Sequence, residues 1–434
     1  MTTIDTLLHA RWIVPIIPRN QILENQTLAI HDGKIIDILE TSDAKKKYSA
    51  KNNIDRSKHV VMPGLINTHT HAPMNIFRGI ADDLPLMDWL NNYIWPAEQK
   101  IINADSVYHG SLHAITEMIR GGTTCFSDHY FFPLDTARAA LKASMRAAIG
   151  LHVMSVPTLW AQGEMDSIAK AKVAYANRPH DPLLTWTIAP QGPYTNSDKS
   201  LCMAKALAEE YNLQFHIHLH ETQAELAIDL KAHGKRPLQR FLDLGLIDEK
   251  LIAVHMVHLT EEEIALCAEK KVHISHNPES NLKLASGFAP IVKLMKAGVN
   301  VCLGTDGAAS NNDLDMFGEL RTAAFIAKAV NQDPTVLDAM TALEMATING
   351  AKALRLEKTI GSIEKGKYAD IIAVDFDYLN TQPVYNPISH LVYAVNSLQV
   401  SDVWIAGKQL LNRGEFTELD KAEIIQDAVR YVRV

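Results

Sequence analysis

Two histidines, two residues apart, follow a short apolar run near the start of the chain. His69 and His71 end the stretch 60–71, which contains a Pro-Gly break before the pair. In an extended strand, side chains at positions i and i+2 point to the same face. The pair can therefore present two imidazoles side by side, which suits a divalent metal ion. The simpler alternative is two polar residues at the end of an ordinary strand.

Further side chains that can bind metal or transfer protons occur where later apolar runs end: His216, His218, His220 and Glu221, then His255, and then Asp306. The three alternating histidines share one face, so spacing alone does not decide which of them binds metal. His218 is the middle choice, because Glu221 lies three residues on, within reach of a water held by the ion. Three histidines and a carboxylate make a nitrogen and oxygen shell for one metal ion.

One metal ion beside a carboxylate suits hydrolytic attack on an sp² carbon. A bound divalent ion lowers the pKa of its water toward ~7 and supplies hydroxide at neutral pH. We expect Asp306 to take the proton and His255 to orient the attacking oxygen. We expect Glu221 to protonate a ring nitrogen and then the leaving group. The alternatives are a ligand or core role for His255, and for Glu221 a role as the N-cap or a first-turn acid of the following helix.

A second, bridged metal ion would need a carboxylated lysine at the end of a middle strand. The fourth apolar run ends at residues 189–191, Ala-Pro-Gln, and offers no lysine. We therefore expect a single ion.

Eight strand-like apolar runs position these side chains, at residues 60–67, 123–128, 148–156, 183–189, 214–219, 251–255, 272–275 and 299–304. Amphipathic stretches separate them, at 106–120, 197–211, 261–270 and 313–330 among others. Eight strand–helix units predict a (β/α)8 barrel of the α/β class, in which the strand ends converge at the C-terminal face. An open doubly wound sheet is the alternative, but no GxGxxG motif follows the first run. Strand-like segments with turn signals, such as Asp32-Gly33-Lys34, occupy both ends of the chain.

Composition and charge exclude several classes of partner. The 434 residues are 47% hydrophobic and 21% charged, as in an ordinary soluble enzyme, and the formal net charge is -8. A negative chain does not favour nucleic acid or an anionic membrane as its partner. The four cysteines form no CxxC pair, and no signal peptide or membrane-length apolar run is visible. We expect a cytoplasmic protein.

Four motifs occur in combination: PGLINTHTH at 63–71, HLHET at 218–222, SHNPESNLKL at 275–284 and LGTDGAASNN at 303–312. Together with residues 361–371, they resemble the amidohydrolase superfamily, and within it the 5-methylthioadenosine/S-adenosylhomocysteine deaminases. The resemblance implies a distorted (β/α)8 TIM barrel with a small β-sandwich built from both termini. The implied boundaries are 1–62 and 359–434 for the sandwich and 63–358 for the barrel. A small-molecule nucleoside substrate and a homo-oligomer, either dimer or tetramer, are also implied.

Carried over position by position, the resemblance assigns the metal ligands as His69, His71, His218 and Asp306. They would hold one zinc ion, or iron as in some relatives. Glu221 becomes the proton shuttle to the purine, with Asp306 and His255 at the attacking water. The implied substrate contacts are Glu98 at the ribose hydroxyls, Trp89 near the purine or its 5′ substituent, Ser310 in the pocket lining, and Gln191. Without the resemblance, Glu98 would be interpreted as an exposed helix residue and Trp89 as core packing.

Two positions depart from the family pattern. Gln191 stands where the family usually has a histidine, and its amide can still donate to a purine nitrogen, although it carries no charge. Some relatives bind the homocysteine carboxylate through an arginine after the third strand, and residues 155–165 contain none. These departures favour 5′-methylthioadenosine or adenosine over S-adenosylhomocysteine.

The leading hypothesis is a metal-dependent aminohydrolase that converts an adenosine-type nucleoside to the inosine-type product and ammonia. A relative acting on a free base or a triazine is the first alternative, and Glu98 separates the two because a free base has no ribose. The second alternative is an inactive relative that serves as a binding or assembly subunit. The complete set of metal ligands with Glu221 argues against that alternative.

Overall fold

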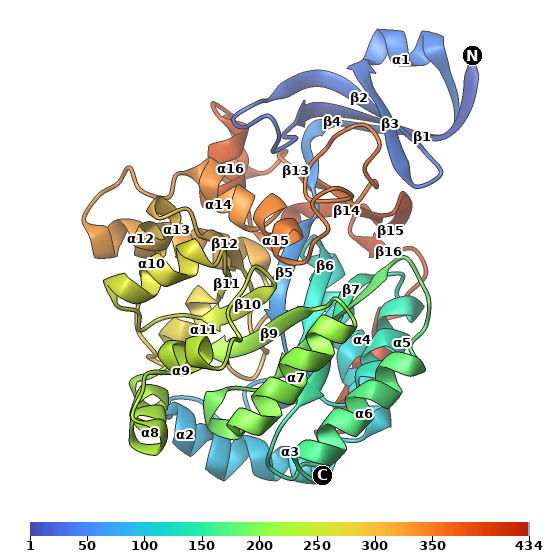
Figure 1. The fold of residues 1–434 in the computed structure, drawn as a ribbon. Coiled ribbons are helices and arrows are strands. Elements are labelled where there is room, and N and C mark those ends of the chain that lie inside the picture. Colours follow the sequence, from blue (N-terminus) through green and yellow to red (C-terminus); the bar gives the residue numbers. More distant parts are fainter. Residues whose placement is uncertain (433–434) are drawn as a thin grey trace. The chain divides into compact units, whose positions relative to one another are not determined.

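The computed structural model describes residues 1–432, which form two eight-stranded sheets with helices around them (Figure 1). Contacts divide the chain into two compact units. The first comprises Met1–Ile66, Glu117–Cys125 and Asp315–Asp420, and the second comprises Asn67–Thr116, Phe126–Leu314 and the chain from Lys421 onward. The domain boundaries expected from the sequence, at 62/63 and 358/359, stay a prediction.

The first sheet is mixed and takes strands from both ends of the chain, in the order β16-β15-β14-β13-β4-β1-β2-β3. Its strands are β1 (Thr2–Ile13), β2 (Leu23–His31), β3 (Lys34–Glu40), β4 (Tyr48–Pro63), β13 (Ile371–Asp375), β14 (Val400–Ile405), β15 (Lys408–Asn412) and β16 (Glu415–Phe416). The turn predicted between β2 and β3 is confirmed. Asp32 and Gly33 take φ values of 49° and 75°, the left-handed conformation that tight hairpin turns require.

A buried ion pair joins the N-terminal and C-terminal parts of this sheet. Arg56 of β4 donates from Nε and Nη2 to the two carboxylate oxygens of Asp402 of β14, at 2.7 and 2.6 Å. Their side chains are only 6% and 0% exposed. Planar two-point pairing satisfies both charges, so the pair links β4 to β14 across the intervening strand β13.

The second sheet is the predicted barrel, in the order β12-β11-β10-β9-β8-β7-β6-β5. Its strands are β5 (Leu65–Thr70), β6 (Thr123–Asp128), β7 (Arg146–Val153), β8 (Leu184–Pro190), β9 (Gln214–Leu219), β10 (Leu251–His255), β11 (His273–His276) and β12 (Asn300–Leu303). The pairings from β7 through β12 are parallel. All eight predicted runs therefore contain strands of the barrel, and two boundaries are corrected: β7 ends at Val153 rather than at residue 156, and the first run is divided between the two sheets. Residues 60–63 of the first run end β4 in the other sheet, and Gly64 separates them from β5.

Helices occupy the segments between barrel strands. They are α4 (Ala104–Arg120), α5 (Pro133–Lys142), α6 (Glu164–Ala176), α7 (Asp198–Glu210), α8 (Gln223–His233), α9 (Pro237–Asp243), α10 (Glu261–Glu269), α11 (Pro278–Lys283) and α12 (Ile291–Lys296). Helices α5 and α6 pack on β7, and α7 packs on β8 (Figure 1). In the loop after β5 lie η1 (Ala72–Phe77), α2 (Leu86–Trp89), a π-helical turn η2 (Leu90–Ile94) and α3 (Trp95–Ile101).

The remaining helices are α1 (Thr41–Lys47), α13 (Met316–Asn331), α14 (Ala339–Met345), α15 (Ile348–Ala353), α16 (Pro387–Tyr393) and α17 (Lys421–Val429), and short 3-10 turns are η3 (Pro193–Thr195), η4 (Leu379–Thr381) and η5 (Ser397–Gln399). Among the described residues, none of these helices combines the length and the apolar character needed to cross a bilayer.

Polar contacts bring the first and last barrel strands together at their C-terminal ends. The backbone N–H of Asp306, just beyond β12, donates to the carbonyl of His69 in β5 at 3.0 Å. One strand residue earlier, the Thr68 hydroxyl donates to the carbonyl of Leu303 at 2.8 Å. These bonds place the first histidine pair beside Asp306.

We predict that Asp402→Ala destabilises the protein by about 3–5 kcal/mol, because it leaves the guanidinium of Arg56 buried without its counter-charge. The matched control is Asp377→Ala, which removes the partner of Lys58 in an exposed ion pair and should change stability by less than about 1 kcal/mol. Urea unfolding followed by circular dichroism measures both. Equal midpoints for Asp402→Ala and wild type would contradict the prediction.

Candidate active site

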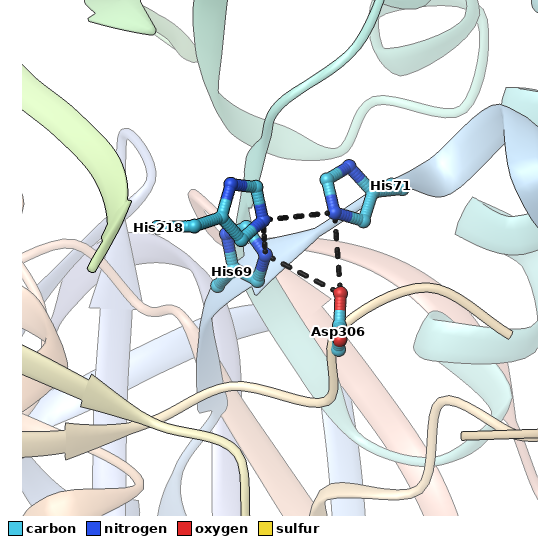
Figure 2. A group of neighbouring side chains, drawn as sticks. All are labelled: His69, His71, His218 and Asp306. Atoms are coloured by element: carbon cyan, nitrogen blue, oxygen red, sulfur yellow. Dashed lines mark hydrogen bonds and ion pairs between the residues drawn. The ribbon is translucent and has the colours of Figure 1, made fainter. Parts of the chain in front are cut away.

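Four side chains meet at the C-terminal end of the barrel: His69 and His71 of β5, His218 of β9, and Asp306 after β12. Figure 2 shows them pointing toward one another. The Nε2 atom of His218 lies 3.1 Å from that of His69 and 3.2 Å from that of His71. Asp306 Oδ1 lies 3.4 and 3.2 Å from the same two histidine atoms. All four residues are buried.

Backbone carbonyls fix the orientation of two of these imidazoles. His71 Nδ1 lies 2.6 Å from the carbonyl of His129, which follows β6. His218 Nδ1 lies 2.5 Å from the carbonyl of Gln191, which follows β8. A carbonyl can only accept, so each Nδ1 carries the proton and each Nε2 presents its lone pair to the shared centre.

The third imidazole is held by another histidine. His69 Nδ1 lies 3.0 Å from His216 Nε2, and Ser127 Oγ lies 3.4 Å from the other nitrogen of His216. His216 is therefore placed one layer deeper than the ligand set, where it orients His69. His220, the third histidine of that run, makes its hydrogen bonds to the surrounding backbone. Its Nδ1 bonds to the carbonyl of His258, and its Nε2 accepts from the N–H of Leu238.

The donor set fits one divalent ion. Ligands about 2.0–2.1 Å from a tetrahedral ion lie about 3.3 Å from each other, close to the separations found here. Three neutral nitrogen lone pairs and a carboxylate facing one point repel each other unless a cation lies between them. The arrangement therefore suits a metal ion, and among the described residues no cysteine belongs to this group.

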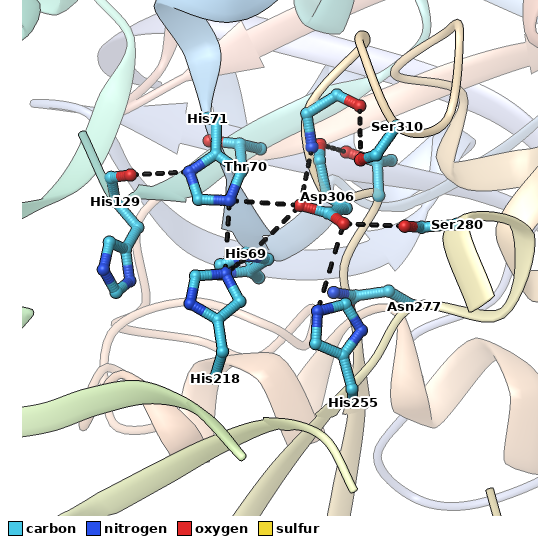
Figure 3. A network of polar contacts seen from close by, with 12 residues as sticks. His69, Thr70, His71, His129, His218, His255, Asn277, Ser280, Asp306 and Ser310 are labelled. Carbon is cyan, nitrogen blue, oxygen red and sulfur yellow. Dashed lines mark hydrogen bonds and ion pairs between the residues drawn. The ribbon is translucent and has the colours of Figure 1, made fainter. Parts of the chain in front are cut away.

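The carboxylate of Asp306 divides its two oxygens between two tasks (Figure 3). Oδ1 faces His69 and His71 and accepts from the backbone N–H of Gly307. Oδ2 accepts from the hydroxyl of Ser280 at 2.7 Å and lies 4.0 Å from His255 Nε2. Oδ2 thus faces His255 rather than the two ligand histidines, and beyond the Ser280 bond it keeps a lone pair that can take a proton.

Helix α11 also orients His255. Asn281 Oδ1 lies 2.8 Å from His255 Nδ1, so Nδ1 carries a proton and Nε2 turns toward Asp306 and Glu221. Ser280, the preceding residue, holds Asp306. Adjacent residues of one helix therefore position both partners of this pair.

Glu221 lies two residues beyond β9, 3.9 Å from His255 Nε2. It is not the cap of the next helix, because Thr222, the residue before α8, is the N-cap and its side chain accepts from the backbone N–H of Glu225. The Glu225 carboxylate in turn accepts from the backbone N–H groups of His220 and Glu221 at 2.8 Å each. Burial raises the pKa of Glu221 above the usual carboxyl value, and His255 opposes that rise. A carboxyl with a raised pKa keeps its proton to a higher pH than an ordinary carboxyl.

A cavity of about 510 Å³ opens beside the metal centre. Every predicted site residue except His69 lines it, and His69 is fully buried behind the other ligands. The volume suits a small organic substrate.

Glu98 of α3 faces this cavity together with Tyr130, which follows β6. The tyrosine hydroxyl donates to Glu98 Oε1 at 2.5 Å, and within the described chain Oε2 has no hydrogen-bond partner. Burial raises the pKa of Glu98 to about 7, and the tyrosine bond opposes that rise. One carboxylate oxygen is thus held, and the other is open to a ligand.

The remaining predicted contacts also reach the cavity. Trp89 donates its indole N–H to the carbonyl of Ala81 at 3.1 Å, so it offers the cavity an apolar ring. Ser310 donates to the carbonyl of Gly307 at 3.1 Å, which leaves its hydroxyl oxygen as an acceptor.

Four residues at the site were not predicted: Tyr130, His152, Ser280 and Asn281. A signal existed for the last two, which lie inside the SHNPESNLKL motif. Tyr130 and His152 lie at the ends of the second and third barrel strands, where a barrel places its active-site residues.

The comparison with protein families gives one match. The model described as Amidohydrolase family covers residues 60–410, and so includes all eight barrel strands.

Curated relatives match nearly the whole chain. A 5-methylthioadenosine/S-adenosylhomocysteine deaminase of Saccharophagus degradans is 45% identical over 427 residues, which cover 98% of this chain and 96% of the relative. A 5′-deoxyadenosine deaminase of Methanocaldococcus jannaschii is 42% identical over 93% of this chain and 95% of its own length.

A solved structure is similar throughout. The crystal structure of an adenosine deaminase from Xanthomonas campestris with bound zinc has a TM-score of 0.97 and 45% sequence identity, over 99% of this chain and 98% of that one. The barrel, the converging histidines and carboxylate, and the sequence matches agree: this chain belongs to the amidohydrolase family.

Proposed function

We propose that the protein is a divalent-metal-dependent hydrolase that deaminates an adenosine-type nucleoside. Water adds at C6 of the base, the bond from C6 to the amino nitrogen breaks, and the inosine-type product and ammonia leave. The observation that carries the proposal is the meeting of the metal centre, Glu221 and His255 at one wall of a nucleoside-sized cavity. The names of the two curated relatives above, both deaminases of adenosine-type compounds, support it.

We propose zinc as the ion, held by His69, His71, His218 and Asp306. A nitrogen-rich set with one carboxylate suits Zn²⁺, and iron in the ferrous state is the alternative. The similar crystal structure, which contains zinc, supports this choice. When bound, the ion would lower the pKa of a water molecule toward ~7 and so provide a nucleophile at neutral pH.

Asp306 and His255 act on the attacking water. Asp306 Oδ2 is the oxygen turned away from His69 and His71, so it takes the proton of the water. His255, held by Asn281, keeps its Nε2 edge toward the same point and orients the water for attack.

Glu221 supplies protons to the base. With its pKa raised by burial, the carboxyl donates to the ring nitrogen next to C6. Asp306 passes the proton taken from the water to the amino group, which leaves as ammonia, and the proton of the new C6 hydroxyl returns to Glu221 as the C6 carbonyl forms.

The order of the barrel strands matches the order of atoms along one edge of a purine nucleoside. From C6 this edge presents N1, then N3, then the ribose at N9. Around the barrel, Glu221 follows β9, Gln191 follows β8, and Tyr130 with its partner Glu98 follows β6. We therefore assign Glu221 to N1, Gln191 to N3 and Glu98 to the ribose hydroxyls.

The cavity wall favours an uncharged 5′ substituent. Apolar side chains such as Leu90, Ile94, Met154 and Val156 line it. Among the described residues no lysine or arginine lines the cavity, whereas Glu98, Glu221 and Asp306 do. An amino-acid or phosphate tail would meet no cation here, so 5′-methylthioadenosine or 5′-deoxyadenosine is the better substrate class.

We also propose a cytoplasmic location and a homo-oligomeric state. Cys125, Cys267 and Cys302 are buried and free, which agrees with a reducing compartment. The oligomeric state rests on the resemblance to the family alone.

We predict that Glu221→Gln lowers kcat by roughly 10²- to 10⁴-fold, because the amide cannot transfer a proton. Steady-state ammonia release measures kcat, and metal analysis of the same sample shows whether the ion is retained, as expected for a residue outside the ligand set. A kcat within threefold of wild type would rule out Glu221 as the proton carrier.

The test of the proposed function is ammonia release from 5′-methylthioadenosine, 5′-deoxyadenosine, adenosine, S-adenosylhomocysteine, adenine and guanine. We predict that kcat/KM for 5′-methylthioadenosine exceeds that for S-adenosylhomocysteine at least roughly 10-fold, since a buried charge without a partner costs more than a kilocalorie per mole.

In Glu98→Gln the activity on the nucleosides should fall, while the activity on adenine should not. Preferred turnover of a free base, unaffected by Glu98→Gln, would contradict the nucleoside assignment.

A further inference from the structure

We propose that His152 is a positioning residue for substrate recognition: its Nε2–H holds the amide oxygen of Gln191 and so turns the amide NH₂ toward the base. The inference rests on the proposed function, because it concerns how the same cavity holds an adenosine-type ring. It gives a role to a buried histidine that neither binds metal nor transfers protons in the mechanism above.

The contact lies in the cavity wall. His152 Nε2, near the end of β7, lies 3.1 Å from Gln191 Oε1, immediately after β8, and both residues line the cavity. His152 is 2% exposed, and its ring packs edge-on against Phe131, with the centroids 4.6 Å apart. The backbone of Gln191 is fixed too, because its N–H donates to the carbonyl of Val153 and its carbonyl accepts from His218. Only the side-chain amide of Gln191 retains freedom, and His152 is its one hydrogen-bond partner among the described residues.

Two arrangements of this pair are chemically possible. In the first, His152 donates from Nε2 to the amide oxygen, and its buried Nδ1 is a bare acceptor. In the second, the amide NH₂ donates to Nε2, and the imidazole proton lies on Nδ1. That nitrogen is buried and has no partner within the described chain. A buried N–H without an acceptor is the more costly defect, so the first arrangement is favoured.

A neutral imidazole carries a single N–H proton, on either Nδ1 or Nε2. Burial lowers the pKa of His152 to about 4, although the bond to Gln191 opposes that change, so the ring is neutral in the working range of the enzyme. A neutral ring that donates to Gln191 makes the amide a fixed donor toward the cavity.

A fixed donor selects the base. It pairs with a ring nitrogen that has a free lone pair, such as N3 of adenine, and disfavours a C–H or N–H at the same place. A histidine, the family's usual residue at position 191, could present either a donor or an acceptor to the base, depending on its tautomer. In this protein His152, on the neighbouring strand, orients the amide of Gln191 and so makes it a donor.

The test compares adenosine with 3-deazaadenosine, in which a C–H replaces N3. The readout is the ratio of their kcat/KM values or, where turnover of the analogue is too slow, the ratio of the inhibition constant of the analogue to KM for adenosine. Intrinsic reactivity differs between the two compounds, but the difference is the same for every variant and cancels. We expect Gln191→Met to reduce the preference for the N3 compound roughly 10- to 100-fold.

The preference should also fall at least fivefold in His152→Phe, which keeps Gln191 but removes the group that orients it. The double variant should behave like Gln191→Met alone. His152→Gln, whose amide nitrogen reaches the place of the imidazole Nε2, should restore most of the preference. His276→Phe is the control, since it removes another buried imidazole that does not line the cavity, and should leave the preference within twofold of wild type.

The outcomes separate the inference from the proposed function. If wild type releases no ammonia from any adenosine-type nucleoside, the proposed function is wrong. If wild type is active but His152→Phe keeps the full preference for N3, His152 does not act through Gln191 and the inference is overturned. An equal loss of activity on both compounds in His152→Phe, with the ratio unchanged, shows a packing role only and overturns it as well.

Discussion

The site depends on three imidazole lone pairs that point at one another. The Nε2 atom of His218 lies 3.1 and 3.2 Å from those of His69 and His71, and the carboxylate of Asp306 closes the group. A cation among these atoms stabilises the arrangement, because neutral nitrogen lone pairs repel each other and an unpaired buried carboxylate is costly. The surrounding protein therefore has one main task, which is to prevent these rings from turning away.

The barrel performs this task with its backbone. The imidazole of His71, just after β5, is held by a carbonyl just after the neighbouring strand β6. The imidazole of His218 on β9 is held by a carbonyl just after the neighbouring strand β8. These carbonyls belong to His129 and Gln191. Tyr130, the residue after His129, and Gln191 itself line the cavity. The same strand ends thus orient the proposed metal ligands and present the groups proposed to contact the substrate.

Much of this could be predicted from the sequence, because alternation and spacing within one strand decide which face a side chain takes. The pairing of His69 with His71 and the eight barrel strands followed from such local patterns. The strand boundary at Gly64 was wrong in the prediction, since residues 60–63 are equally apolar in either sheet. Which of three alternating histidines binds metal was left open by spacing and depends on depth in the barrel.

The contacts between strands could not be predicted in this way. His152 and Gln191 are 39 residues apart, and Tyr130 and Glu98 are 32 apart, so no local period relates them. Glu98 has the pattern of an exposed helix residue, and its place in the cavity comes from the loop that carries α3. These contacts depend on the register of neighbouring strands and on the path of one long loop, and both are properties of the folded chain.

The most direct test of the central claim is X-ray absorption at the metal edge of the purified protein, together with its metal content. We predict one divalent ion per chain, with three imidazole nitrogens and one carboxylate oxygen from the protein at about 2.0–2.1 Å and no sulfur in the shell. A sulfur ligand, a count of imidazoles other than three, or two ions per chain would contradict the account.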